Sequence, residues 1–477
     1  MAKDVVCVVG AGTAGLESLL AARARFGADL DLRLIAPERE FRYRPMTEAS
    51  LFRPAAERGL AIADLVAETG ATWVQDRVDA VHEQDGVVLT RDGDTVPFDY
   101  LLLSIGGHTR RPLHQGAVWE RGRDPGVLDQ IIAEILMDEI RTVAVNIPRG
   151  ARWPLPGYEL ALVLAWRAAN SAARVTLLTA EERPLGALGS VATAAVSAEL
   201  DAAGVEVIAG VEVSDEAQPA DAPTQPITLT LAGAGPPELA FDRLLSLPTV
   251  VAPFLAGVPT DDAGFIETDE TLKVCGSPRV WAAGSCIAAE LEHSALAAQQ
   301  ADAAIDAIAA AARRGAGGDG ERSDPPGAGD LTGMILTGQR TRWLAENPPG
   351  IKQPSTRVLW WPPGRAVGRM LAQRIEAWDP AVHQQLPADA GGVAIRAPIA
   401  LGCSDGSALR EPGEVSPDVR AARLRDIENR QLMAVSRRER AADAELQALS
   451  AGLESLAARQ QQVIRELQRQ GYLHNRR

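Results

Sequence analysis

The sequence has few of the features of membrane-spanning, secreted or metal-binding chains. No uninterrupted apolar run reaches the roughly 18 residues that a spanning helix needs, and the N-terminal segment lacks the layout of a signal peptide. The four cysteines, Cys7, Cys275, Cys286 and Cys403, form no CxxC pair and no metal-ligand spacing. We therefore expect unpaired cysteines, no metal site and a cytoplasmic protein, with peripheral membrane contact as the alternative.

Lysine is also scarce, and the charge is unevenly spread. Three lysines stand among 48 basic residues, which leaves few candidates for an amine nucleophile. The formal net charge is −15, but the segment from Ser416 to Arg477 holds 12 arginines against 8 acidic residues. The rest of the chain is thus strongly acidic, which argues against nucleic acid as a partner. Metalloprotease and phosphotransfer functions have no motif either, because HExxH and P-loop patterns are missing.

The first motif that is present is a glycine-rich turn inside a strand–helix–strand pattern. The chain has 477 residues, 46% of them hydrophobic and 23% charged, so it has room for two to four domains with buried cores. Residues 4–9 and 30–35 have the apolar runs of buried parallel strands, and residues 16–26 are predicted to form a helix. Between the first strand and the helix lies GxGxxG, with Gly10, Gly12 and Gly15.

Each residue of this turn has a predicted role in binding a dinucleotide. Gly10 permits the tight turn, Gly12 lets a pyrophosphate approach the helix N-terminus, and Gly15 lets the helix pack close to the strand. Glu38 follows the second strand, where a carboxylate accepts hydrogen bonds from ribose hydroxyls. The alternative is a glycine turn that binds no ligand.

A second α/β pattern follows and is inserted into the first. Its predicted strands cover 143–147, 175–179 and 205–208, and its predicted helices cover 157–170 and 191–203. The chain then returns with a strand at 279–282 and an alanine-rich helix at 296–312. This order predicts an α/β fold with two Rossmann-like three-layer domains.

Four segments together resemble a known family. They are the GxGxxG unit with Glu38, the loop Phe41–Pro45, the strand region Phe98–Gly106, and Val280–Ser285 followed by Leu296–Asp302. They are similar to the flavoproteins with two dinucleotide-binding domains, which include type II NADH dehydrogenases, sulfide:quinone oxidoreductases and flavocytochrome c sulfide dehydrogenases. The resemblance covers roughly residues 4–378, and some strings are similar to those of actinobacterial members.

The resemblance implies an FAD domain interrupted by an NAD(P)-type domain, followed by a smaller C-terminal segment. The expected parts are the first part of the FAD domain (1–112), the second Rossmann-like domain (113–246), the second part of the FAD domain (247–314), a flexible loop (315–330), a small segment (331–383), a linker (384–417) and a helical tail (418–477).

The implied activity is two-electron transfer through FAD, in which the flavin supplies the chemistry and the protein supplies binding and orientation. The expected FAD-binding residues are Gly10, Gly12, Thr13, Ala14, Gly15, Glu38, Gly106, Gly284 and Ser285. The family normally has Asp where this chain has Ser285, which forms a weaker hydrogen bond. Glu290 and Glu292 would disfavour an anionic reduced flavin.

The second nucleotide site departs further from the family. Pro148 to Glu159 contains prolines and Trp153 where a nicotinamide nucleotide would need a glycine turn, so NAD(P)H is a candidate donor that the sequence disfavours. The expected acceptor is a quinone or another small molecule.

Two residues are candidates for catalysis. His293 would lie near the flavin ring and could transfer a proton, and Cys286 is the best candidate for a reactive thiol. The structural alternatives are a packed histidine and a buried cysteine, as we expect for Cys7 and Cys275. His108 follows a predicted strand end, where it could lie near the flavin pyrophosphate or adenine; the alternative is a partly exposed loop histidine. Because no cysteine lies in Pro148–Tyr158, classical sulfide and disulfide chemistry is disfavoured.

The tail carries the strongest non-enzymatic signal. From Leu432 to Leu467 mainly apolar residues, interrupted by the polar Glu439 and Gln460, repeat at alternating spacings of three and four. This pattern predicts a coiled coil and a homo-oligomer. A helix docked on the body and an amphipathic membrane-surface helix are the alternatives. Trp360 and Trp361 are predicted to pack on the FAD domain or to lie at a lipid interface.

Two functional hypotheses result. The first is an FAD-dependent oxidoreductase that passes two electrons from an unidentified donor to a quinone or other small acceptor and assembles through its tail. The second is a redox-impaired descendant of that fold that acts as a scaffold or assembly protein. The intact glycine turn with Glu38 favours the first, whereas Ser285, Glu292 and the missing second glycine turn favour the other.

Overall fold

The structure is a computed structural model that describes residues 3–42, 59–119, 125–216 and 226–315, apart from residue 234, and short stretches between residues 329 and 403. All of these belong to one compact unit formed by residues 1–410. The predicted coiled coil at 432–467 and the Trp360-Trp361 pair lie outside the described residues.

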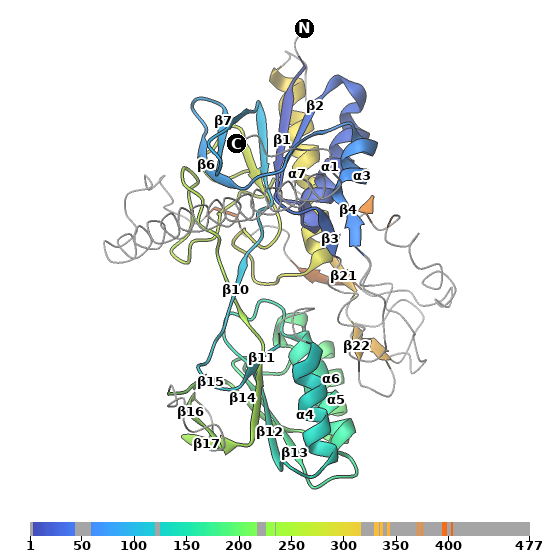
Figure 1. Cartoon of the computed structure of the whole chain (residues 1–477), viewed down its shortest axis with the longest axis vertical. Helices are drawn as coiled ribbons and strands as arrows, with labels where there is room; N and C mark the ends of the chain where they lie inside the picture. The colour runs from blue at the N-terminus through green and yellow to red at the C-terminus, as the bar shows by residue number, and fades with distance from the viewer. Residues whose placement is uncertain are drawn as a thin grey trace, which may run out of the picture. The chain divides into compact units, whose positions relative to one another are not determined.

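The first α/β domain is built on a parallel sheet whose strands come from both ends of the described chain (Figure 1). In order across the sheet these are β20 (Val280–Ala282), β9 (Tyr100–Leu103), β1 (Val5–Val9), β2 (Asp31–Ile35) and β5 (Thr72–Val74). The runs of apolar residues in β1 and β9 are almost wholly buried, as parallel strands covered on both faces require.

Helices cover one face of this sheet and a small antiparallel sheet lies on the other (Figure 1). The helices are α1 (Thr13–Phe26), α3 (Ile62–Thr69) and α7 (Ser294–Gly315), with the 3₁₀ turn η1 (Gly27–Asp29). The antiparallel sheet consists of β6 (Val78–His82), β7 (Val87–Thr90) and β8 (Thr95–Pro97). α1 packs directly against α7, so the first and last helices of the domain form one layer.

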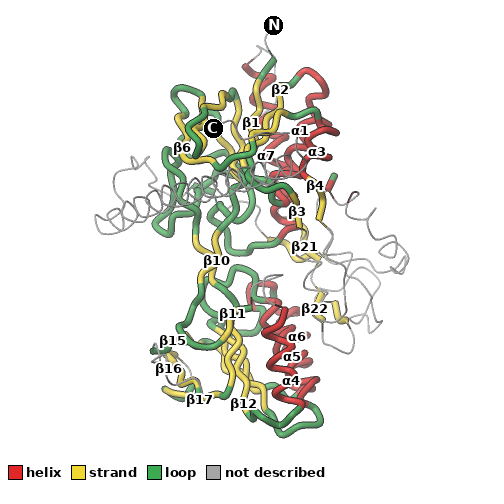
Figure 2. The backbone as a smooth tube through the Cα atoms, viewed as in Figure 1, coloured by secondary structure: helices red, strands yellow, loops and turns green. Residues whose placement is uncertain are grey.

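The second α/β domain repeats the same plan (Figure 2). Its parallel sheet has the order β11 (Ala117–Val118), β18 (Arg243–Ser246), β12 (Thr142–Ile147), β13 (Arg174–Thr179) and β14 (Glu206–Ala209). Its helical elements are α4 (Pro125–Leu136), α5 (Leu155–Ala168), η2 (Gly186–Leu188) and α6 (Ser190–Ala203), and its antiparallel sheet consists of β15 (Val211–Ser214), β16 (Ile227–Gly233) and β17 (Glu238–Phe241).

The chain passes between the domains through two strands. These are β10 (His108–Arg110) and β19 (Thr249–Val251), which pair antiparallel. They lie close to the predicted boundaries at 112/113 and 246/247. The predicted fold class, two Rossmann-like domains with one inserted into the other, is thus confirmed.

The remaining strands form three two-stranded ladders. They are β3 (Glu40–Arg42) with β4 (Gly59–Ala61), β21 (Gly329–Thr332) with β24 (Ala394–Ala397), and β22 (Met334–Leu336) with β23 (Thr341–Trp343). A later part of the chain, at residues 370 and 371, is also bound to the first domain through Glu17, a buried acid on α1. Its carboxylate accepts backbone N–H bonds from Met370 and Leu371, each at 2.8 Å.

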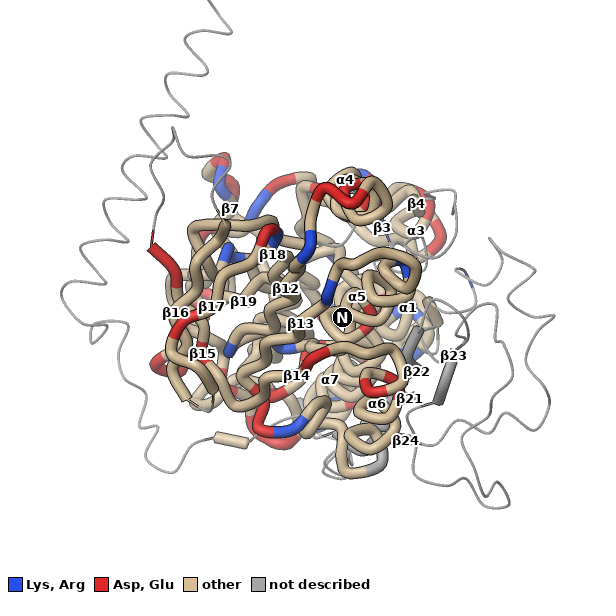
Figure 3. The backbone as a smooth tube through the Cα atoms, turned by 90° about the horizontal axis from the view of Figure 1, so that it is seen from below, with Lys and Arg blue, Asp and Glu red and all other residues tan. Residues whose placement is uncertain are grey.

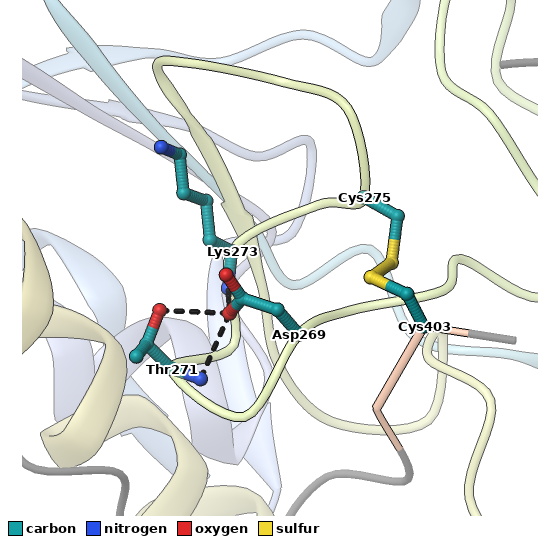
Figure 4. Close-up of a disulfide and its surroundings, with 5 residues drawn as sticks. All are labelled: Asp269, Thr271, Lys273, Cys275 and Cys403. Carbon is teal, nitrogen blue, oxygen red and sulfur yellow. Dashed lines mark hydrogen bonds between the residues drawn. A yellow bond between two sulfur atoms is a disulfide. The ribbon is translucent and has the colours of Figure 1, made fainter. Parts of the chain in front are cut away.

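The expectation of four unpaired cysteines is wrong for two of them. Cys275 and Cys403 form a disulfide, with their Cα atoms 6.0 Å apart (Figure 4). The cysteines are 128 residues apart in sequence, and the contact depends on tertiary structure that local spacing does not reveal. Cys275 follows a turn in which the Asp269 carboxylate accepts bonds from Thr271 and from the Lys273 N–H. Cys7 and Cys286 are free and buried.

No helix in the described part of the chain is both long enough and apolar enough to cross a membrane. Figure 3 shows acidic and basic residues interspersed along the described backbone of this unit.

Candidate active site

The site lies at the carboxyl edge of the first sheet. β1 stands between β2 on one side and β9 with β20 on the other, and ligands of parallel sheets bind outside the strand ends at such a point. Gly10, Gly106 and Gly284 follow the ends of β1, β9 and β20, and all three have positive φ, at +101°, +73° and +85°. Because glycine has no Cβ, the chain can turn away from this edge at all three positions without a steric penalty.

The three glycines of the turn have three different surroundings. A Cβ on Gly10 would lie 2.3 Å from the Ser104 carbonyl oxygen, and a Cβ on Gly15 would lie 1.9 Å from the Gly10 carbonyl oxygen. A Cβ on Gly12, the N-cap of α1, would meet nothing within 4 Å. The first two glycines are therefore needed for packing, whereas Gly12 borders open space at a helix N-terminus.

This arrangement fits the pyrophosphate of a dinucleotide. The first N–H groups of a helix lack partners within the helix and favour an anion, and Thr13 and Ala14 supply two of them. Glu38 is exposed three residues after β2, the strand that pairs with β1, and a carboxylate at this position would accept hydrogen bonds from ribose hydroxyls. The residues present therefore fit the adenosine diphosphate part of FAD.

The structure brings Gly284 and Ser285, from the second part of the expected FAD domain, to the same edge of the sheet. A Cβ on Gly284 would lie 3.4 Å from the Ala14 side chain, and one on Gly107 would lie 3.4 Å from the Ser285 carbonyl oxygen. The Gly284 N–H donates to Oε1 of Gln300 on α7 at 2.8 Å. The predicted FAD residues from three distant stretches of sequence therefore line one edge of the sheet.

Arg152 is a residue of this site that the sequence reasoning did not single out. It comes from the second domain, yet its guanidinium donates to the carbonyl oxygens of Ser285, Ile287 and Ala289 at 2.8–3.1 Å. The same group lies 4.5 Å above the Phe265 ring. The one feature of the sequence that could have pointed to Arg152 is its place in the loop that replaces the expected glycine turn.

Arg152 also changes the electrostatics expected around Glu292. Burial lowers the pKa of Arg152, while the nearby Glu292 carboxylate opposes that shift. The Glu292 N–H donates to the Arg152 carbonyl oxygen at 2.9 Å. The carboxylate that we expected to disfavour an anionic flavin therefore has a buried cation close by.

His293 caps the last helix of the domain. Its Nδ1 accepts the Ala295 N–H at 3.1 Å at the start of α7, and its buried ring lies 4.6 Å from the Trp153 ring between centroids. In the neutral ring the proton is then carried by Nε2. Proton transfer by His293 would have to use Nε2, because Nδ1 is engaged.

Cys286 has the surroundings of a packed cysteine. It is fully buried, and its Sγ lies 3.4 Å from the Ala283 carbonyl oxygen. Burial raises the pKa of its thiol to about 11. Because the thiolate is the nucleophile, this environment argues against the predicted catalytic role. His108 is exposed, as its structural alternative predicted, but it lies on the strand β10 and not in a loop.

Comparisons with known proteins agree with this architecture. Residues 4–152 and 154–306 match the model of the pyridine nucleotide-disulphide oxidoreductase family. The mitochondrial sulfide:quinone oxidoreductase of Dictyostelium discoideum is 30% identical over 105 residues, which cover 21% of this chain and 23% of that protein. The alignment thus spans about a quarter of that curated relative.

Solved structures extend the likeness in fold. The sulfide:quinone oxidoreductase of Aquifex aeolicus has a TM-score of 0.62 at 16% identity and covers 81% of this chain and 93% of its own. A ferredoxin reductase of Rhodopseudomonas palustris has a TM-score of 0.53 at 18% identity, with 72% and 82% covered.

Proposed function

Since this chain belongs to the pyridine nucleotide-disulphide oxidoreductase family, we propose that it passes two electrons through FAD from a small donor to a quinone or other small acceptor. Membership in this family makes it an oxidoreductase with FAD as its cofactor, as the sequence predicted. The observation that carries the proposal is the open space in front of Gly12 at the N-terminus of α1.

Several residues would hold the cofactor. The N-terminus of α1 would bind the pyrophosphate, and Glu38 would accept hydrogen bonds from the ribose hydroxyls. The Gly284-Ser285 segment would lie against the rest of the FAD molecule. When bound, FAD accepts and releases electron pairs. Arg152 bonds to the carbonyl oxygens of Ser285, Ile287 and Ala289. Any proton transfer by His293 would use Nε2, because Nδ1 accepts the Ala295 N–H. The chain's own residues thus bind, orient and exclude water around a redox group.

Reconstitution with FAD tests this proposal. We expect the purified full chain to take up FAD and to show a flavin spectrum that dithionite bleaches. Gly12→Ala should weaken FAD binding about tenfold, because its methyl group projects into the ligand space while the backbone, at φ −78°, is unstrained. Gly186→Ala is the matched control, since the nearest atom to its Cβ lies 3.9 Å away. No flavin band after reconstitution would favour the scaffold hypothesis instead.

Acceptor and assembly are separate parts of the proposal. Reoxidation of the reduced protein by a soluble short-chain quinone tests the acceptor, and a quinone dissolved in a bilayer would require peripheral contact with a membrane. The heptads at 432–467 support a homo-oligomer. Truncation after Pro412 should reduce the mass measured by light scattering, and an unchanged mass would remove the coiled-coil prediction.

A further inference from the structure

The second domain contains a structural counterpart of the FAD-binding unit. β12, α5 and β13 follow one another as β1, α1 and β2 do, and β12 lies between β13 and β18 as β1 lies between β2 and β9. Ile147 pairs with Thr179 at the end of β12 as Val9 pairs with Ile35 at the end of β1. The same rule therefore places a dinucleotide crevice at the carboxyl end of β12.

Glu181 is the counterpart of Glu38 in this unit. It follows β13 by two residues, at the position where an acid would accept the ribose hydroxyls of a pyridine nucleotide. Here the Tyr158 hydroxyl donates to Glu181 Oε2 at 2.6 Å and accepts the Leu185 N–H at 3.3 Å. The second oxygen, Oε1, is buried from solvent. The carboxylate is thus engaged by the protein itself.

The helix that would face the phosphates is blocked as well. Pro154 is the N-cap of α5 and Pro156 lies in its first turn, so both lack the N–H that would bind a phosphate. Pro154, Leu155 and Tyr158 are all buried, whereas Gly12 at the equivalent end of α1 is exposed. The packing glycine is retained in Gly157, whose Cβ would lie 2.4 Å from Ile147 Cγ1. The unit keeps its fold but has lost its phosphate site.

The loop after β12 contacts the first domain instead. Arg152, in this loop, bonds to three carbonyl oxygens of residues 285–289. Trp153 lies against His293 at the start of α7. A segment that would hold a pyrophosphate therefore braces the segment next to the proposed flavin site.

From these contacts we infer that Tyr158, Glu181 and Pro156 close the second domain to pyridine nucleotides. This inference rests on the proposed function and names its donor class. The reductant that loses the two electrons gained by the flavin therefore has no adenosine diphosphate part that the second domain would bind. Tyr158 and Glu181 are positioning residues that decide this specificity.

Calorimetry with NADH and NADPH tests the inference on the full chain loaded with FAD. We expect no saturable heat at concentrations up to about 1 mM, the upper end of ordinary KM values, and no anaerobic bleaching, whereas dithionite bleaches the same sample. Saturable binding or bleaching by either nucleotide would overturn the inference. A chain that holds no FAD would contradict the proposed function, but the calorimetry would still test the closed domain.

A double variant tests which residues close the domain. Pro156→Ala with Tyr158→Ala restores an N–H, vacates the ring position and frees Glu181, so NADH affinity should rise at least tenfold over the wild type. FAD content and melting temperature show whether the variant is folded. If it is not, Pro156→Ala with Tyr158→Leu keeps an apolar filler and should show the same gain. A folded variant without any gain would overturn the assignment to these residues.

Discussion

The two strand–helix–strand units of this chain share one topology and differ in the first turn of the helix. In the first unit Gly12 is exposed at the helix N-terminus and Glu38 is exposed beside it. In the second unit Pro154 is buried at the equivalent place and Glu181 bonds to Tyr158. A parallel sheet in which the chain continues to opposite sides of a central strand therefore does not by itself make a ligand site. On the function proposed above, helix N–H groups that face open space and an accessible acid distinguish the crevice that binds a dinucleotide from the one that does not.

The largest expected effect compares the packing glycines of the two units. Gly15→Ala should destabilise the protein by about 3 kcal/mol or more, because its Cβ would meet the Gly10 carbonyl oxygen, a backbone atom that cannot move aside. Gly157→Ala should cost less, about 1–3 kcal/mol, because its Cβ meets an isoleucine side chain. Urea unfolding of both variants measures the difference. Equal losses would contradict the comparison.

A second effect concerns the disulfide of the first domain. Cys403→Ser should lower the free energy of unfolding by about 2–4 kcal/mol, since the bridge links residues 128 apart. Urea unfolding under non-reducing conditions measures the loss. A dithiol should destabilise the wild type similarly and leave the variant unchanged. A variant as stable as the wild type would show that the bridge does not form in solution.

The acids that follow β2 and β13, Glu38 and Glu182, should contribute differently to FAD binding. Glu38→Gln should weaken FAD binding about tenfold, as expected for the loss of a charge-assisted hydrogen bond. Glu182→Gln, an exposed acid in the second unit, is the matched control and should leave FAD binding unchanged. Fluorescence titration with FAD measures both affinities. Similar affinities for wild type and Glu38→Gln would remove the ribose assignment.

The smallest effect is the pH dependence of the second unit. Burial raises the pKa of the Glu181 carboxyl, so its ionisation destabilises the fold as the pH rises above about 4, the ordinary value of a glutamate. Glu181→Gln should therefore melt higher than the wild type at pH 7, and the difference should shrink towards pH 4. A melting temperature that differs equally at both values would contradict the raised pKa.

Local sequence predicted the glycine unit well because each of its roles depends on neighbouring residues. The helix predicted at 16–26 forms at Thr13–Phe26, and the strand predicted at 30–35 forms at Asp31–Ile35. The alanine-rich helix predicted at 296–312 forms at Ser294–Gly315. These elements follow from apolar periodicity and from the glycines between them.

Contacts between distant residues could not be predicted in this way. The Cys275–Cys403 bridge and the bonds from Arg152 to residues 285–289 join segments more than 100 residues apart. Burial, which the sequence did not reveal, also argues against a reactive Cys286, whose position after Gly284-Ser285 had suggested reactivity. The sequence came nearer to predicting the role of Glu181, because Glu181 follows a predicted strand just as Glu38 does. Its contact with Tyr158 depends on the fold.

Nucleotide stoichiometry tests most directly the claim that one unit binds a dinucleotide and its counterpart does not. After reconstitution and removal of free ligand, absorbance and protein concentration together give the amount of FAD per chain, and anaerobic addition of NADH follows on the same sample. The account predicts one FAD per chain and a spectrum that NADH leaves unchanged. A chain without FAD, or one whose flavin NADH reduces, would contradict it.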